Sequence, residues 1–180
     1  MNKKIILAAA FIASVLPNLA MAWSIKSLGI FDGASSDAYG INNSGQVIGY
    51  YYHVDSASLR PFITGPNGEG MSDLGTLGGR GLTFSYDIND SGQVVGHSSS
   101  LDNRDHAFIT GPDGVGMADL GTLGGLDSFA HGINNSGQAI GDSWTTSPYT
   151  THAFITGPNG IGMTDLGTLG GTWSMCLEYQ

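Results

Sequence analysis

Short apolar segments alternate with polar, glycine-containing turns along almost the whole chain after Trp23. In one unit, the segments DAYGI and QVIGYYY flank the turn NNSG at residues 42–45, and RPFIT and EGMSDLG flank the turn GPNG at residues 65–68. β-Prone runs on both sides of Asn-, Pro- and Gly-containing turns are typical of antiparallel hairpins. No apolar period of 3.6 residues with caps predicts a helix after Trp23. Each unit is therefore predicted to contain four short antiparallel strands.

This unit occurs three times, at a spacing of about 46 residues. Three motifs mark each copy. FITGP starts at Phe62, Phe108 and Phe154, DLGTLGG at Asp73, Asp119 and Asp165, and INNSGQVIG or a variant of it at Ile41, Ile88 and Ile133. Four antiparallel strands in a repeat of this length match the size of a β-propeller blade. We predict an all-β fold of about three propeller-like, four-stranded antiparallel blades, an incomplete β-propeller. A β-solenoid-like repeat array is the alternative.

The repeat sets the expected organisation of the chain. Residues 23–172 form the predicted repeat β domain, with units at roughly 31–79, 80–125 and 126–171. Residues 173–180 read as the truncated start of a fourth unit, because no INNSGQ motif follows Ser174. Closed propellers have typically four to eight blades. Three units are therefore expected to leave blade edges exposed and to self-associate through them.

The first 22 residues have the pattern of a secretory signal peptide. Lys3 and Lys4 precede an apolar run at residues 5–16, and Ala-Met-Ala at residues 20–22 fits a small-residue cleavage site. The run is shorter than the roughly 20 residues that a membrane-spanning helix needs. We expect export to the periplasm or the outside of a bacterial cell, with no membrane span after cleavage.

Charge and cysteine content narrow the classes of partner. The chain has 6 Lys+Arg and 15 Asp+Glu, and two of the lysines precede the cleavage site, so the mature net charge is 4 − 15 = −11. An acidic protein repels phosphate backbones, and nucleic-acid binding is not expected. The single cysteine, Cys176, cannot form an internal disulfide. Stability must then come from a hydrophobic core or from assembly.

The ordered motifs also resemble those of a known family. HAFITGP at His106 and His152, followed by DLGTLGG and an INNSGQ-type motif, is similar to the bacterial HAF-repeat family. The resemblance extends from about Ser27 to Thr172, although the first unit has Arg-Pro-Phe in place of His-Ala-Phe. It implies an extracellular protein of repeated β units. It supplies no catalytic residues, because the function of that family is uncharacterised.

We expect the repeated polar residues to have a structural role rather than to bind a metal. Asp73, Asp119 and Asp165 are possible calcium ligands, but calcium takes about 6–8 oxygen ligands and DLGTLGG offers one carboxylate and one threonine. We expect these carboxylates to accept backbone amides of the glycine-rich bend, and we expect no cofactor. His106 and His152 are expected to pack or to form hydrogen bonds beside the FITGP phenylalanines.

Residues that break the repeat are the better candidates for ligand contacts. The stretch between the two hairpins of a unit is variable, and we expect ligand-contact loops there that carry Tyr50, Tyr51, Tyr52, Trp144 and Tyr149. Such rings could stack on sugars or contact a surface ligand. No G-x-S-x-G, H-E-x-x-H or Walker motif is present, and no catalytic or metal-binding residues are predicted. We predict a non-enzymatic scaffold or surface-binding module. The alternatives are a propeller-type enzyme acting on polysaccharide and a truncated, non-functional remnant.

Overall fold

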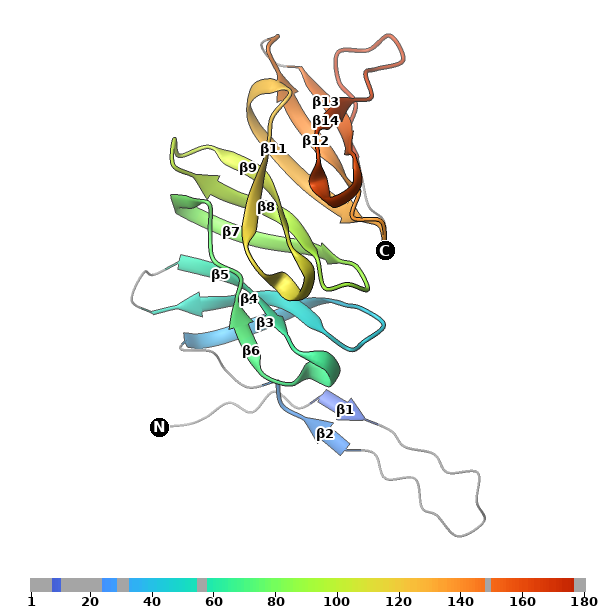
Figure 1. Cartoon of the computed structure of the whole chain (residues 1–180). Coiled ribbons are helices and arrows are strands. Elements are labelled where there is room, and N and C mark those ends of the chain that lie inside the picture. Colours follow the sequence, from blue (N-terminus) through green and yellow to red (C-terminus); the bar gives the residue numbers. More distant parts are fainter. Residues whose placement is uncertain (1–7, 11–23, 29–32, 55–57, 148–149, 177–180) are drawn as a thin grey trace.

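A computed structural model describes residues 8–10, 24–28, 33–54, 58–147 and 150–176. It contains three four-stranded antiparallel sheets that follow one another in chain order, one above the next (Figure 1). This arrangement confirms the predicted all-β fold of blade-like repeats. In each sheet the strands lie in the order in which they occur along the chain, so each blade is a simple meander.

Equivalent strands of the three sheets have similar lengths. The first sheet contains β3 (Gly33–Ile41), β4 (Val47–His53), β5 (Ser58–Thr64) and β6 (Met71–Asp73). The second contains β7 (Gly78–Ile88), β8 (Val94–Ser100), β9 (Asp105–Thr110) and β10 (Met117–Gly121). The third contains β11 (Gly124–Ile133), β12 (Ala139–Thr145), β13 (Thr151–Thr156) and β14 (Met163–Asp165). The second and third sheets begin two residues before the predicted unit boundaries.

A separate two-stranded pair precedes the first blade. β1 (Ala8–Ala10) pairs antiparallel with β2 (Ser24–Lys26). β1 falls within the predicted signal peptide, and the rest of that segment lies outside the described residues.

Turn chemistry explains why both hairpins close where they do. In the first blade Gly45 has φ 75°, and the GPNG turn places Asn67 at φ 56° and Gly68 at φ 69°. All three torsions lie in the left-handed region that Gly and Asn tolerate. The two turns also pack on each other, because the Asn67 amide donates to the Ser44 carbonyl at 3.1 Å and the Gly68 amide to the Gly45 carbonyl at 2.9 Å. The other two blades repeat these turns. Short 3-10 segments lie at the second turn of each blade, at Pro66–Gly68, Pro112–Gly114 and Pro158–Gly160.

The hydrophobic core lies between the sheets. β5 contacts β7, and β9 contacts β11, so each blade covers a face of the next. Two clusters result. The first consists of Ile48, Ile63, Leu74, Ile88, Val94 and Phe108, and the second of Val95, Ala107, Ile109, Ala130, Ala139 and Phe154. Burial of each large side chain contributes roughly 1.5–3 kcal/mol. Most of the stability is therefore expected at the junctions between blades.

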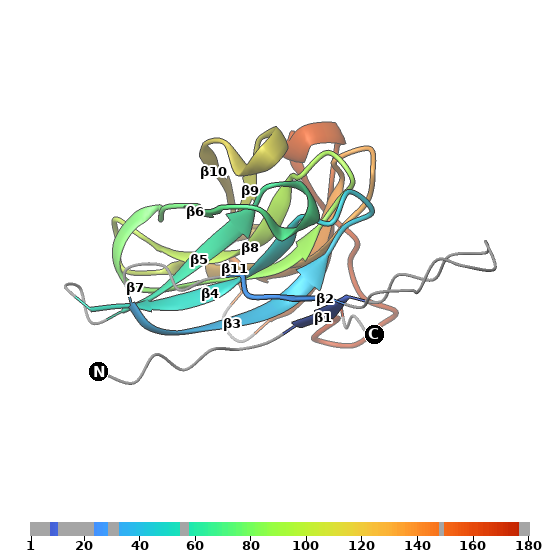
Figure 2. The same cartoon turned by 90° about the horizontal axis from the view of Figure 1, so that it is seen from below.

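The first strands of the blades form one side of the molecule. β3 contacts β7, and β7 contacts β11. Seen from below, β3 lies on one side of the stack and the short fourth strands β6 and β10 lie on the other (Figure 2). Residues on the first strands of different blades are thereby brought together, although they are about 46 residues apart in the sequence.

The start of the predicted fourth unit docks on the third blade. The Ser174 hydroxyl accepts the Ala153 amide at 2.9 Å and donates to the Gly167 carbonyl at 2.7 Å. Ser128, at the equivalent position of the third unit, makes the matching bonds to the second blade. It accepts the Ala107 amide at 2.9 Å and donates to the Gly121 carbonyl at 2.6 Å.

Candidate functional site

Each first strand contains a β-bulge at the same place. The pairing register shifts between Ala38 and Gly40 in β3, between Ser85 and Asp87 in β7, and between Ala130 and Gly132 in β11. The intervening residues are Tyr39, Tyr86 and His131. Bulges re-aim a side chain and are frequent beside functional sites. Tyr39 is 51% exposed and Tyr86 is 36% exposed, so the bulges present two tyrosine rings to solvent.

The adjacent second strands add a partner to each bulge residue. Tyr50 lies 5.0 Å from Tyr39, and His97 lies 5.4 Å from Tyr86, between ring centroids. In the third blade His131 Nε2 is 2.6 Å from Asp142 Oδ1. One repeat position thus carries a Tyr–Tyr, a Tyr–His and a His–Asp pair. Binding and catalysis need unlike groups in unlike roles, and here the repeat supplies them.

These pairs join into a continuous row of rings. Across the first junction, Phe84 lies 5.9 Å from Tyr50, and within the second blade it lies 5.3 Å from His97. Across the second junction, His97 lies 4.9 Å from Phe129, and Tyr86 lies 5.7 Å from His131. We call this set the aromatic row; it consists of Tyr39, Tyr50, Phe84, Tyr86, His97, Phe129 and His131. The row crosses all three sheets, so its formation depends on correct stacking of the blades.

Burial and nearby charges shift the pKa values of three residues in the row. Partial burial and a hydrogen bond with Tyr50 raise the pKa of Tyr39 to about 12. Burial also raises the pKa of Tyr86, and the charges of Asp105 and Asp142 raise it further. Burial lowers the pKa of His97; the charge of Asp105 opposes this shift, and His131 adds to it. At neutral pH Tyr39 and Tyr86 are therefore protonated and His97 is neutral.

The buried histidine should make stability depend on pH. Because the pKa of His97 is lower in the folded state, the unfolded chain takes up the proton first as the pH falls. The free energy of unfolding therefore decreases below about pH 6.5, the ordinary pKa of histidine. We expect His97→Phe, which fits beside Phe84 and Phe129, to reduce the slope of thermal midpoint against pH in this range. His53→Phe is the control for loss of a histidine. A slope unchanged in His97→Phe would contradict this assignment.

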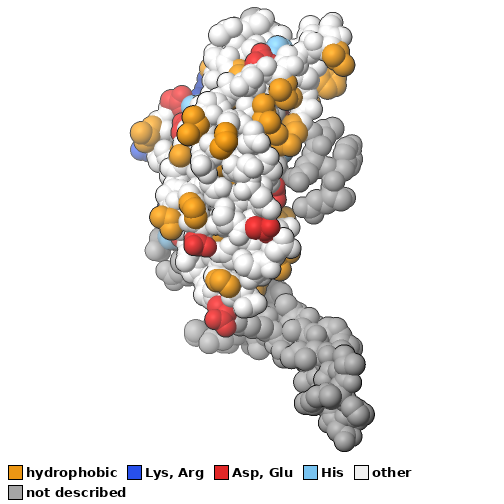
Figure 3. Space-filling view, turned by 45° about the vertical axis from the view of Figure 1, so that its right-hand side comes forward, with side chains coloured by type: hydrophobic (Ala, Val, Ile, Leu, Met, Phe, Trp, Pro, Cys, Tyr) orange, Lys and Arg blue, Asp and Glu red, His pale blue; other side chains and the backbone are white. Residues whose placement is uncertain are grey.

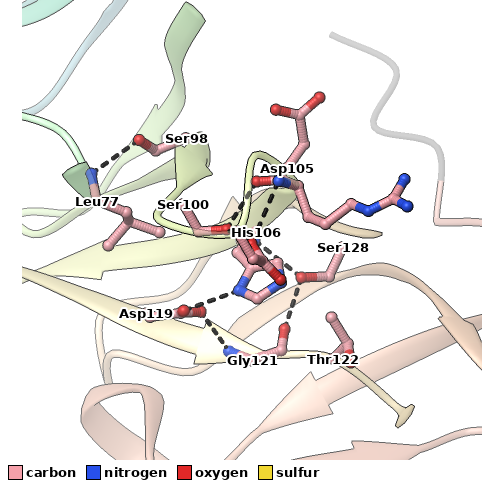
Figure 4. A network of polar contacts seen from close by, with 12 residues as sticks. Leu77, Ser98, Ser100, Asp105, His106, Asp119, Gly121, Thr122 and Ser128 are labelled. Atoms are coloured by element: carbon pink, nitrogen blue, oxygen red, sulfur yellow. Dashed lines mark hydrogen bonds and ion pairs between the residues drawn. The ribbon is translucent and has the colours of Figure 1, made fainter. Parts of the chain in front are cut away.

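The repeated aspartates have a structural role. Figure 4 shows His106 Nδ1 directed at Asp119 Oδ2, at 2.8 Å, while Asp119 Oδ1 accepts the Gly121 amide at 2.7 Å. The same figure shows Ser128 tying the bend to the neighbouring blade. These contacts match the expectation of carboxylates that accept backbone amides. The equivalent pairs are Arg60–Asp73 at 3.0 Å and His152–Asp165 at 2.9 Å.

The stacked NNSG turns form a polar hollow of about 410 Å³. Asp90 is at its centre and accepts the side-chain amides of Asn43 at 2.8 Å and Asn135 at 2.9 Å. These hydrogen bonds lower the pKa of Asp90. The amides and carboxylate in this hollow are used to join the blades to one another. The repeated motif is therefore explained by architecture.

The five predicted contact residues have different surroundings. Tyr50 belongs to the aromatic row. Tyr51 is fully buried and its hydroxyl donates to Asp73 Oδ2 at 2.7 Å, so it does not suit a ligand contact. Tyr52 and Trp144 are exposed, at equivalent positions of the first and third sheets, with the second sheet between them. The tyrosines at 50–52 and Trp144 lie on strands β4 and β12 rather than in loops, and Tyr149 lies outside the described residues.

The bulge residues were not predicted as site residues from the sequence. Tyr39, Tyr86 and His131 each stand two positions before the isoleucine that opens the INNSGQ-type motif. Alignment of the three units shows an aromatic or histidine residue at this position in each unit. That signal was available, but the bulge that re-aims these side chains is visible only in the strand pairing.

The described residues contain no group of three or more His, Cys, Asp or Glu side chains able to hold a metal ion. No helix within the described ranges is long and apolar enough to span a bilayer. Comparison of the chain with protein-family models and with curated proteins finds no match. The similarity to HAF repeats rests on the motifs themselves and stays a prediction.

Proposed function

We propose that this protein is an exported, non-enzymatic repeat module that binds a carbohydrate on the aromatic row. The observation that supports it is the variation at one repeat position, where Tyr–Tyr, Tyr–His and His–Asp pairs from three blades meet in one row. Architecture alone does not require unlike residues at equivalent positions. The signal-peptide pattern and the resemblance to HAF repeats support the extracellular setting.

The chemistry of the row suits a neutral sugar. The exposed rings of Tyr39 and Tyr86 offer apolar faces for stacking on the C–H face of a sugar ring. His131, whose Nε2 is held by Asp142 at 2.6 Å, is partly exposed and can hydrogen-bond a sugar hydroxyl. The mature charge of −11 disfavours strongly anionic polysaccharides. Neutral cell-surface glycans are therefore the expected ligand class.

The proposal predicts a specific loss of binding in Tyr86→Ala. A glycan array probed with the full chain should identify a neutral glycan, and titration with that glycan should measure its affinity. Aromatic stacking contributes about 1 kcal/mol, so Tyr86→Ala should weaken binding by about fivefold or more. Fluorescence or calorimetric titration would measure the change.

Tyr52→Ala is the matched control, because Tyr52 is an exposed strand tyrosine outside the row. It should leave the affinity unchanged. Binding that is lost in Tyr52→Ala and retained in Tyr86→Ala would move the ligand away from the row. Absence of any bound glycan on the array would count against the carbohydrate assignment.

One observation favours a second candidate, an enzyme acting on polysaccharide. The 2.6 Å contact between His131 and Asp142, beside Tyr86, could serve proton transfer. The discriminating measurement is the release of reducing ends from the glycan that binds. Release that His131→Gln abolishes would favour the enzyme, and binding without release would favour the module.

A further inference from the structure

The two internal junctions between blades use the same contacts. The INNSGQ glutamine of one blade reaches the left-handed residue in the GPNG-type turn of the next blade. Gln46 Nε2 donates to Asp113 Oδ1 at 3.0 Å, and Gln93 Nε2 donates to Asn159 Oδ1 at 3.2 Å. Each junction therefore has a donor face and an acceptor face, and the pairing is directional.

Backbone and apolar contacts repeat in the same way. Asn42 Nδ2 donates to the Asn89 carbonyl, and Asn89 Nδ2 donates to the Asn134 carbonyl, both at 3.0 Å. Leu74 Cδ2 lies so close to Gly114 that a Cβ there would be 2.6 Å away. Leu120 Cδ2 approaches Gly160 similarly, at 2.8 Å from the Cβ position. The donor face of a blade thus consists of the Asn and Gln of its INNSGQ-type motif and the Leu of its DLGTLGG motif. All three contact the next blade.

The third sheet also has a donor face. Near its INNSGQ-type turn, no described residue of a further blade covers this face. Gln138 donates to the Thr156 carbonyl of its own blade at 3.4 Å. Leu166 is 59% exposed, whereas its equivalent Leu74 is 6% exposed. A hollow of about 270 Å³ lies on this face; its lining includes Gln138, Ile140 and Ile155. Figure 3 shows hydrophobic side chains to be numerous on the upper half of the molecule, where the third sheet lies.

The first sheet has the complementary acceptor face. Ile41 is 68% exposed, whereas Ile88, at the same position of the second blade, is 8% exposed and packed in a junction. Asn67 takes the left-handed conformation of Asp113 and Asn159, the two residues that receive a glutamine. The chain therefore has half of a junction at each end of its stack.

We propose that a second copy of this chain docks its first sheet on the open face of the third sheet. In this junction Gln138 donates to Asn67 of the second copy, and Leu166 covers Gly68 of the second copy. The interface is head-to-tail, and such interfaces close into rings when the rotation permits. Two copies contribute six blades, within the range of about four to eight found in closed propellers. This inference does not depend on the proposed glycan site.

Two short segments compete with the second copy. Leu28 lies against Gly68, at 2.7 Å from the Cβ position, where Leu166 of another copy would lie. Ser174 bonds the Ala153 amide of the third blade, at the place where the first strand of another copy would lie. Docking must displace both segments. Leu28→Ser should therefore strengthen association, which a non-specific hydrophobic contact would not do.

Cross-linking of two single-cysteine chains tests the predicted pairing. Both chains carry Cys176→Ser; one adds Gln138→Cys and the other, with a mass tag, adds Asn67→Cys. A short bismaleimide should join the two chains only in the mixture. The positive control is Gln46→Cys with Asp113→Cys in one chain, which should cross-link internally because the parent side chains are 3.0 Å apart.

Light scattering coupled to size-exclusion chromatography gives an independent readout. The full chain should show twice the monomer mass, Leu166→Asp should reduce it to the monomer, and Leu28→Ser should keep the dimer at greater dilution. Circular dichroism would establish that the variants are folded. A monomeric mass at every concentration would overturn the proposal. So would failure of the mixed chains to cross-link while the internal control reacts.

Discussion

Gly96→Ala is expected to destabilise the protein by about 3 kcal/mol or more, because the strand has no room for a methyl group. A Cβ at Gly96 would lie 1.9 Å from the Phe84 carbonyl oxygen and 3.0 Å from Cε1 of Phe108. The first neighbour is backbone and the second is a fully buried ring, so neither can move aside freely. Urea unfolding followed by circular dichroism would measure the loss as a lower midpoint.

Gly116→Ala separates this packing effect from the conformational freedom of glycine. Gly116 has φ 69°, and a Cβ there would meet no atom within 4 Å. Its replacement should cost only the left-handed strain of about 1–2 kcal/mol. If Gly96→Ala cost no more than Gly116→Ala, the close approach of β7, β8 and β9 would not be what selects glycine at this position.

The same constraint occurs once in every blade. Gly49 and Gly141 are equivalent to Gly96, and a Cβ at either would also lie 1.9 Å from a carbonyl oxygen of the first strand. The final glycine of the INNSGQVIG motif is therefore fixed by the contact between strands within a blade. The turn glycine, Gly45 in the first blade, is fixed by its φ of 75°.

Local chemistry made most of the fold predictable. The GPNG turn specifies its conformation within four residues, and Asn67 and Gly68 adopt left-handed torsions, which Asn and Gly tolerate. The four strands of each blade follow from these turns and from the fixed spacing of the repeat. Three four-stranded sheets result, as expected.

The candidate site was less predictable because it depends on contacts between blades. Tyr50, Tyr51 and Tyr52 are consecutive aromatic residues in the sequence, yet Tyr51 is buried while Tyr50 faces Phe84 of the next blade. Alternation along a strand separates neighbours in this way. Which face is covered depends on the position of the blade in the stack. The approach of Tyr86 to His131 likewise requires the second junction.

The position of a blade should also decide what its asparagine contributes to stability, and Asn89 is the clearest case. Asn89 is 3% exposed. Its Oδ1 accepts the Ser91 amide at 3.1 Å and the Gln93 amide at 3.0 Å, and its Nδ2 donates to the Asn134 carbonyl at 3.0 Å. Asn89→Ala leaves these backbone groups without their partner, and the Gln93 amide among them is buried. Since one unsatisfied buried group costs about 1–3 kcal/mol, we expect a loss of about 3 kcal/mol.

Asn134→Ala is the matched substitution in the third blade, and urea unfolding of both variants is the measurement. Asn134 makes the same turn contacts, accepting the Ser136 amide at 2.9 Å and the Gln138 amide at 3.0 Å, but it is exposed. Water can replace its hydrogen bonds, so we expect a loss of about 1 kcal/mol. Equal losses would mean that the motif acts only as a local turn. A larger loss at Asn89 would show that the repeated motif also joins the blades, and that its contribution to stability is determined by the neighbour that covers it.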